Sequence, residues 1–111
     1  MTDLAADAFR TIGPGEAVPN EHVVPYYLED RKQRISIARV DDRLYAFDDI
    51  CTCAAEGCPL SGGLLSGTTI TCQCHGSVFD ITTGAVNRGP ATRALQVYEV
   101  QEVEDGIQIR T

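Results

Sequence analysis

All five cysteines of this 111-residue chain lie in two short segments, residues 51–58 and 72–74, and one of its two histidines directly follows the second segment. Thiolates and imidazoles gathered in this way are typical ligands of zinc and of iron–sulfur centres. Zinc ribbons use Cys-x-x-Cys pairs, whereas both pairs here are Cys-x-Cys. The pattern therefore predicts a metal centre held by two loops about twenty residues apart.

The second segment, Cys72 to Asp80, reads Cys-Gln-Cys-His-Gly-Ser-Val-Phe-Asp and resembles the second cluster loop of Rieske-type 2Fe-2S proteins. The pattern of that family is Cys-x-His, then fifteen to seventeen residues, then Cys-x-x-His. The resemblance implies that Cys72 and His75 bind the two different irons. It also implies that the Ser77 hydroxyl donates a hydrogen bond to a bridging sulfide. The alternative for Ser77 is a serine at a strand start that bonds its own backbone.

The first segment matches the family pattern only in part. Counted from Cys53, the pattern gives sixteen residues before Cys72, which fits, but places Ala55 in the histidine position. Counted from Cys51, it gives eighteen residues, which is too long, and places Cys53 in the histidine position. We prefer the register from Cys53 because its spacing fits.

The preferred register leaves one ligand position without a donor, because the methyl group of Ala55 cannot bind iron. Cys51 precedes Cys53 by two residues and is the expected substitute, giving a 2Fe-2S cluster with three cysteines and one histidine: Cys51, Cys53, Cys72 and His75. The alternative is that Cys51 is a buried thiol at a strand end and that the cluster is weak, modified or absent.

Cys58 and Cys74 stand where the Rieske proteins of cytochrome bc complexes carry a disulfide between the two cluster loops. The resemblance thus implies a Cys58–Cys74 disulfide. The alternatives are two reduced cysteines or two further ligands.

The charge and the N-terminal segment bear on partners and location. Sixteen acidic side chains against nine basic ones give a net charge of −7, which argues against binding to nucleic acid or to an anionic membrane surface. The acidic balance suits a basic protein partner, or simply keeps a small protein soluble. Residues 1–9 have no basic start and no long apolar run, so we expect no signal or anchor and a cytoplasmic location. We also expect a monomer with one domain.

Short alternating segments separated by turns predict an all-β domain. The segment 22–28 contains Pro25, which indicates an edge strand because proline cannot donate to a neighbour. In residues 34–40, Ile35 and Ile37 alternate with polar residues as in a half-buried strand. In residues 44–48, Leu44 and Ala46 face one side and Tyr45 and Phe47 the other. Further strands are expected at 68–71, 77–80, 94–100 and 107–109, with a hairpin at Asp105-Gly106 and no helix.

The resemblance implies a Rieske-like antiparallel β-sandwich or barrel as a base, with a cluster-binding subdomain at about residues 50–86. The function that it implies is that of a soluble one-electron carrier between a reductase and an oxygenase or similar redox protein, not of an enzyme. One alternative is a non-catalytic small subunit, of the nitrite-reductase type, with an incomplete or absent cluster. The other is a structural module stabilised by zinc.

Overall fold

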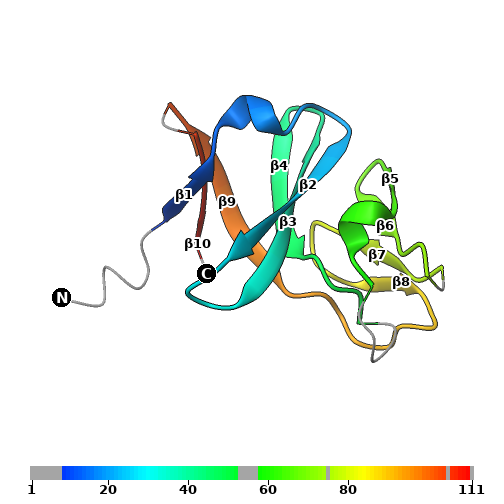
Figure 1. Ribbon diagram of the computed structural model, residues 1–111. Coiled ribbons are helices and arrows are strands. Elements are labelled where there is room, and N and C mark those ends of the chain that lie inside the picture. Colours follow the sequence, from blue (N-terminus) through cyan, green and yellow to red (C-terminus); the bar gives the residue numbers. More distant parts are fainter. Residues whose placement is uncertain (1–8, 53–57, 75, 105, 111) are drawn as a thin grey trace.

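The structure is a computed structural model that describes residues 9–52, 58–74, 76–104 and 106–110. The described chain is almost entirely β-structure arranged in two antiparallel sheets (Figure 1). The strands are β1 (Arg10–Gly13), β2 (His22–Leu28), β3 (Gln33–Val40), β4 (Arg43–Asp48), β5 (Leu64–Ser66), β6 (Thr69–Thr71), β7 (Val78–Asp80), β8 (Val86–Arg88), β9 (Val97–Val103) and β10 (Gly106–Arg110). Two 3-10 turns, η1 (Gly15–Ala17) and η2 (Leu60–Gly62), are the helical elements of the described residues.

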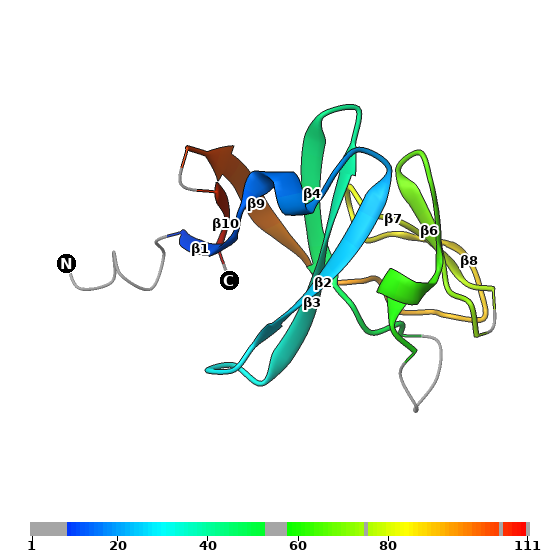
Figure 2. The ribbon, with the colours of Figure 1, turned by 45° about the horizontal axis from the view of Figure 1, so that its top comes forward.

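The larger sheet forms the base of the molecule. Its strand order is β1-β10-β9-β4-β3-β2, so β1 and β2 are its two edge strands. The sheet curves strongly, as in a half-open barrel (Figure 2). Pro25 lies in β2, and the expectation of an edge strand is confirmed.

The smaller sheet has the order β5-β6-β7-β8 and lies at one end of the base (Figures 1 and 2). All four of its strands come from the chain between β4 and β9, residues 49–96. Each strand has only three residues. The small sheet is therefore held in place mainly by what its side chains bury against the base.

Strands β3 and β4 separate two hydrophobic cores. Ile35 and Ile37 face the core inside the base, with Ala46 of β4, while Ala38 and Phe47 face the core shared with the small sheet. The predicted facing of the β4 side chains is confirmed. The prediction that β3 is half-buried is wrong, because residues 35–38 are all buried. The small sheet covers the face that an isolated base would expose.

The other strand predictions hold to different degrees. The segment 22–28 is β2, and the strands expected at 34–40, 44–48, 68–71, 77–80 and 107–109 match observed strands within two residues. The strand expected at 94–100 begins only at Val97. The reason is that the Leu95 N–H donates to the Gly84 carbonyl (2.8 Å), which holds this segment against the small sheet. The hairpin between β9 and β10 forms as expected, although Asp105 lies outside the described residues.

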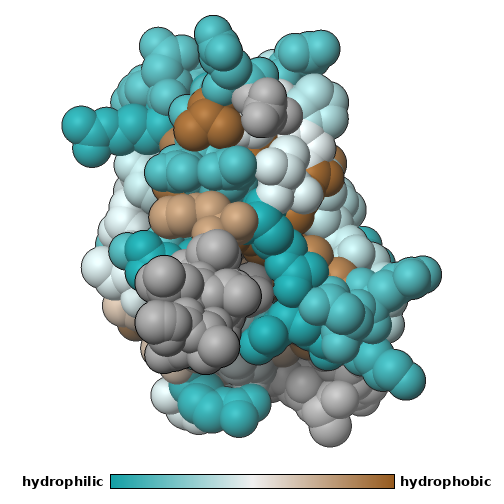
Figure 3. All heavy atoms as spheres, turned by 90° about the vertical axis from the view of Figure 1, so that its left-hand side faces the viewer, coloured by the Kyte–Doolittle hydropathy of each residue, from teal (hydrophilic) through white to brown (hydrophobic). Residues whose placement is uncertain are grey.

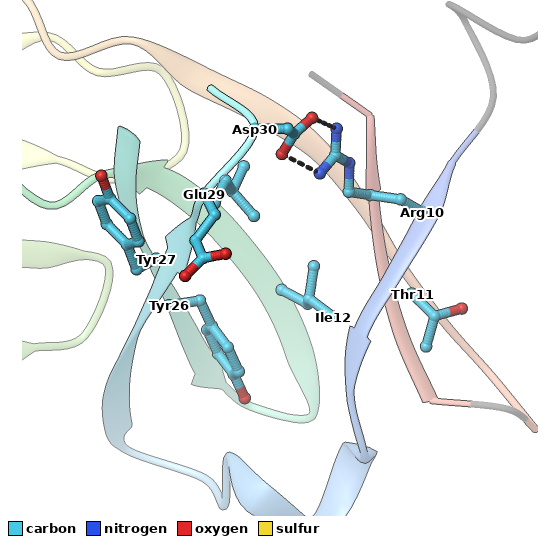
Figure 4. A pocket seen from close by; sticks show the side chains of 8 residues that line it. Arg10, Thr11, Ile12, Tyr26, Tyr27, Glu29 and Asp30 are labelled. Atoms are coloured by element: carbon cyan, nitrogen blue, oxygen red, sulfur yellow. Dashed lines mark hydrogen bonds and ion pairs between the residues drawn. The ribbon is translucent and has the colours of Figure 1, made fainter. Parts of the chain in front are cut away.

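An open groove of about 840 Å³ lies between the two edge strands of the base. Figure 4 shows Arg10 and Ile12 of β1 on one side and Tyr26 of β2 on the other, with the Arg10–Asp30 ion pair (2.7 Å) at one end. Burial raises the pKa of Tyr26, whose hydroxyl is buried without a hydrogen-bond partner among the described residues.

The face of the base away from the small sheet is mainly hydrophilic (Figure 3). No helix in the described part of the chain could cross a membrane.

Candidate metal centre

The first ligand loop rises from a stem of two antiparallel segments, residues 49–51 and 58–60. The Cys51 N–H donates to the Cys58 carbonyl (2.8 Å), Ile50 forms a β-bridge with Pro59, and the Leu60 N–H donates to the Asp49 carbonyl. Because the stem continues directly from β4, the base fixes where the loop begins and where it returns.

The second ligand loop joins β6 to β7 and is equally short. The Cys72 N–H donates to the Ser77 carbonyl (2.8 Å), and the Gly76 N–H donates to the Cys72 carbonyl (3.0 Å). Gly76 has φ +82°, a conformation that side-chain-bearing residues rarely adopt, and this explains the glycine after His75. The tight turn places Cys72 at the base of the loop, where it is buried.

A third loop, residues 89–95, contacts both ligand loops. The Ala91 N–H donates to the Ser77 Oγ (3.0 Å) on the second loop. The Thr52 hydroxyl on the first loop donates to the Arg93 carbonyl (2.6 Å). This loop contains the cis Gly89–Pro90 peptide bond. The two ligand loops are therefore connected through a third segment as well as directly.

The direct connection is a disulfide between Cys58 and Cys74, as the family resemblance implied. Cys58 is partly buried and Cys74 is exposed. The sulfur atoms of Cys58, Cys72 and Cys74 all lie within 4.8 Å of one another. The disulfide thus lies directly beside a predicted ligand, on the outer side of the loops.

The predicted site residues fall into two groups. Cys51 and Cys72 are both almost fully buried, 2% and 1% exposed, and belong to the same core cluster, so the structure brings them to the same end of the molecule. Cys53, Ala55 and His75 lie outside the described residues. The choice between the two registers and the ligand set therefore stay predictions.

Ser77 is fully buried, and its hydroxyl oxygen accepts the Ala91 N–H instead of bonding its own backbone. The hydroxyl proton is not used in this contact, so it is available to an acceptor on the loop side. Thiolates are ligands of iron–sulfur clusters, and a buried hydroxyl beside them can donate a hydrogen bond to a cluster sulfur. The described residues fit such a group.

One buried side chain of this region escaped the sequence analysis. Asp49 directly follows β4 and is fully buried, and its carboxylate accepts hydrogen bonds from the Ser36 hydroxyl (2.7 Å) and the Ser61 N–H (2.7 Å). In the sequence it directly follows the strand expected at residues 44–48 and has no assigned role. No local signal distinguishes a buried aspartate from an exposed one, because its partners lie twelve and thirteen residues away.

Comparisons with known proteins identify the family of the chain. The Rieske [2Fe-2S] domain profile matches residues 10–99. The biphenyl dioxygenase ferredoxin subunit of Pseudomonas sp. (strain KKS102) is 31% identical over 101 residues, which cover 91% of this chain and 84% of that protein. The ferredoxin CarAc of Metapseudomonas resinovorans is 40% identical over 72 residues, and this match spans only 65% of the chain and 64% of that ferredoxin.

A solved structure is similar over nearly the whole chain. It is a chain of the complex of reduced oxygenase and oxidised ferredoxin in carbazole 1,9a-dioxygenase, with a TM-score of 0.82, 26% identity and 94% of both chains covered. The match of the domain profile, the similarity to ferredoxin subunits and the three connected loops lead to one conclusion. The chain belongs to the Rieske [2Fe-2S] domain family.

Proposed function

We propose that this protein is a one-electron carrier that receives electrons from a reductase and passes them to an oxygenase. The observation that carries the proposal is the pair of buried cysteines, Cys51 and Cys72, at the base of two loops that a disulfide and a third loop connect. One similar protein is the ferredoxin subunit of a biphenyl dioxygenase, and a similar solved structure comes from a complex of oxygenase and ferredoxin in carbazole 1,9a-dioxygenase. Like that ferredoxin subunit, the chain is an electron-transfer component and not the catalyst. When bound, a 2Fe-2S cluster supplies reversible one-electron chemistry.

We further propose that Cys51, Cys53, Cys72 and His75 hold the cluster. The position of Cys51 at the base of the first loop, in the same core cluster as Cys72, supports its inclusion. Cys51→Ser should abolish or shift the visible spectrum. Ala55→His should restore a two-histidine spectrum in the preferred register, and it should do little if the pattern starts at Cys51.

The distribution of charge bears on how partners dock. Residues 49–96 hold three of the 16 acidic and two of the 9 basic side chains, a net charge of −1. The described residues of the base carry a net charge of −3, and the remaining −3 comes from Asp3, Asp7 and Asp105, which lie outside the described residues. We propose that partners dock at the loop end, which is nearly neutral, and not on the acidic base. Transfer rates should then depend less on ionic strength than the net charge suggests. A rate to an oxygenase that changes with salt as for a −7 ion would contradict this docking site.

The decisive experiment measures iron, acid-labile sulfide and zinc in the purified protein and then follows electron transfer. A one-electron carrier contains two irons and two sulfides per chain, bleaches when a flavin reductase supplies electrons, and regains its colour when an oxygenase is added. A colourless chain would favour the non-catalytic subunit, and one zinc per chain would favour the structural module. A monomer in solution and a cytoplasmic location stay predictions, which sedimentation and cell fractionation test.

A further inference from the structure

The fully buried carboxylate of Asp49 is the feature that the proposed function leaves unexplained. It is not a ligand in either register of the cysteine pattern. Among the described residues, the only other buried polar side chains are those of Ser36 and Ser77. Burying a carboxylate is costly unless hydrogen bonds and an opposite charge compensate for the lost water. A role that requires Asp49 at this place would explain why the cost is tolerated.

The side chain of Asp49 connects the base to the first ligand loop. Its Oδ1 accepts the Ser36 hydroxyl (2.7 Å) from β3 and the Ser61 N–H (2.7 Å) from η2, which follows the loop. Its Oδ2 forms an ion pair with the Arg34 Nε (2.5 Å), again from β3. A single carboxylate therefore fixes both the strand behind the loop and the segment to which the loop returns.

The backbone of Asp49 makes the same two connections. Its N–H donates to the Arg34 carbonyl (3.1 Å), and its carbonyl accepts the Leu60 N–H. Cys51 is two residues further along the stem. A shift of the Asp49 carboxylate would move the stem against β3, and Cys51 would move with it.

We propose that Asp49 is a positioning residue for the first ligand loop and that its charge lowers the reduction potential of the centre. The proposal rests on the proposed function and names a residue that regulates the same site. A fixed negative charge disfavours the addition of an electron nearby. The Asp49 side chain is fully buried while that of Arg34 is 43% exposed, so solvent screens the arginine more strongly and the negative charge dominates inside.

The neighbouring Asp48 provides a matched control. Its carboxylate points into the base, where it accepts hydrogen bonds from the Tyr98 hydroxyl (2.6 Å) and the Gln33 Nε2 (3.0 Å). Asp48 is partly exposed, and neither of these two hydrogen-bond partners belongs to a ligand loop. Asp48→Asn changes the net charge of the protein by the same amount as Asp49→Asn and should leave the loop in place.

The test compares Asp49→Asn, Asp48→Asn and Arg34→Gln in the protein with its cluster. We expect Asp49→Asn to raise the potential and to accelerate iron loss to a chelator about tenfold, which corresponds to ~1.4 kcal/mol. Arg34→Gln should lower the potential, because it leaves the carboxylate unbalanced. Asp48→Asn should change iron loss by less than about twofold and shift the potential less. If Asp49 and Arg34 served only in folding, Asp49→Asn and Arg34→Gln would not be expected to shift the reduction potential in opposite directions.

Equal effects of Asp49→Asn and Asp48→Asn would overturn the proposal, since net charge alone would then explain them. If Asp49→Asn does not fold, Arg34→Gln decides, and an unchanged or raised potential refutes the role of the charge. A wild-type chain without iron and sulfide would instead contradict the proposed function. The positioning role would still be tested there by the alkylation rate of Cys51 with iodoacetamide, expected to increase in Asp49→Asn and not in Asp48→Asn.

Discussion

The Cys58–Cys74 disulfide should contribute a large part of the stability of this small domain. The two cysteines are 16 residues apart in the sequence. Closing a loop of this length in the unfolded chain removes entropy worth about 3 kcal/mol at 25 °C. The unfolding entropy of a 111-residue chain is about 2.1 cal/mol/K per residue. Loss of the disulfide should therefore lower the unfolding temperature by about 13 °C, which is the 3 kcal/mol divided by the unfolding entropy of the whole chain. Serine at both positions adds little cost in the native state, because Cys74 is exposed and Cys58 only partly buried.

The assay is thermal unfolding followed by circular dichroism, with a second scan of each sample to establish that unfolding is reversible. We expect oxidised wild type to unfold about 13 °C above the Cys58→Ser/Cys74→Ser variant. Adding a phosphine reductant should lower wild type to the level of the variant and leave the variant unchanged. Unfolding temperatures within about 3 °C for the oxidised wild type and the variant would refute the loop-entropy argument.

Three further predictions concern hydrogen bonds and pH. Ser77→Ala removes the acceptor of the buried Ala91 N–H and should lower the free energy of unfolding by about 1–3 kcal/mol. It should also lower the reduction potential of the cluster. An unchanged urea midpoint would contradict the predicted loss of stability. The Arg10 guanidinium lowers the pKa of Asp30 to about 2, so their pair stabilises the fold above about pH 4 and this contribution is lost as the pH falls toward 2. Acid unfolding of Asp30→Asn should therefore differ slightly from wild type at pH 5 and converge with it near pH 2. Burial and the bonded carboxylate of Asp48 raise the pKa of Tyr98, so wild type should lose stability as the pH rises above about 10. Tyr98→Phe should lose less, with the remaining loss coming from Tyr26, and parallel denaturant midpoints for the two proteins between about pH 9 and 11 would disprove this.

The parts of the fold that the sequence predicts are those with local signals. Strands β2 and β3 have seven and eight residues, long enough to show alternation or a strand-rich composition. Strands β5 and β8 have three residues each, too few for a period of two to be visible. Among the described strands, β1 pairs only with β10, at the opposite end of the chain. Its existence therefore depends on a partner that no local window contains.

The same distinction applies to the site. The second ligand loop is recognisable because Cys72, His75 and Ser77 lie within six residues of one another. The burial of Asp49 depends on Arg34 and Ser36 in another strand, and the sequence alone cannot place them beside it. For the same reason the sequence predicts β3 as half-buried, because the small sheet that covers its second face comes from later in the chain.

The hydrogen bond from Thr52 to the Arg93 carbonyl joins residues 41 positions apart, and the Ala91–Ser77 bond joins residues 14 apart. A chain leaving the ribosome exposes its cysteines well before residues 91–93 are available to complete these contacts. The enclosure of the ligand loops is therefore a late event of synthesis, and β9 and β10, which complete the base, follow later still. Enclosure of iron and sulfide between the ligand loops therefore requires a nearly complete chain.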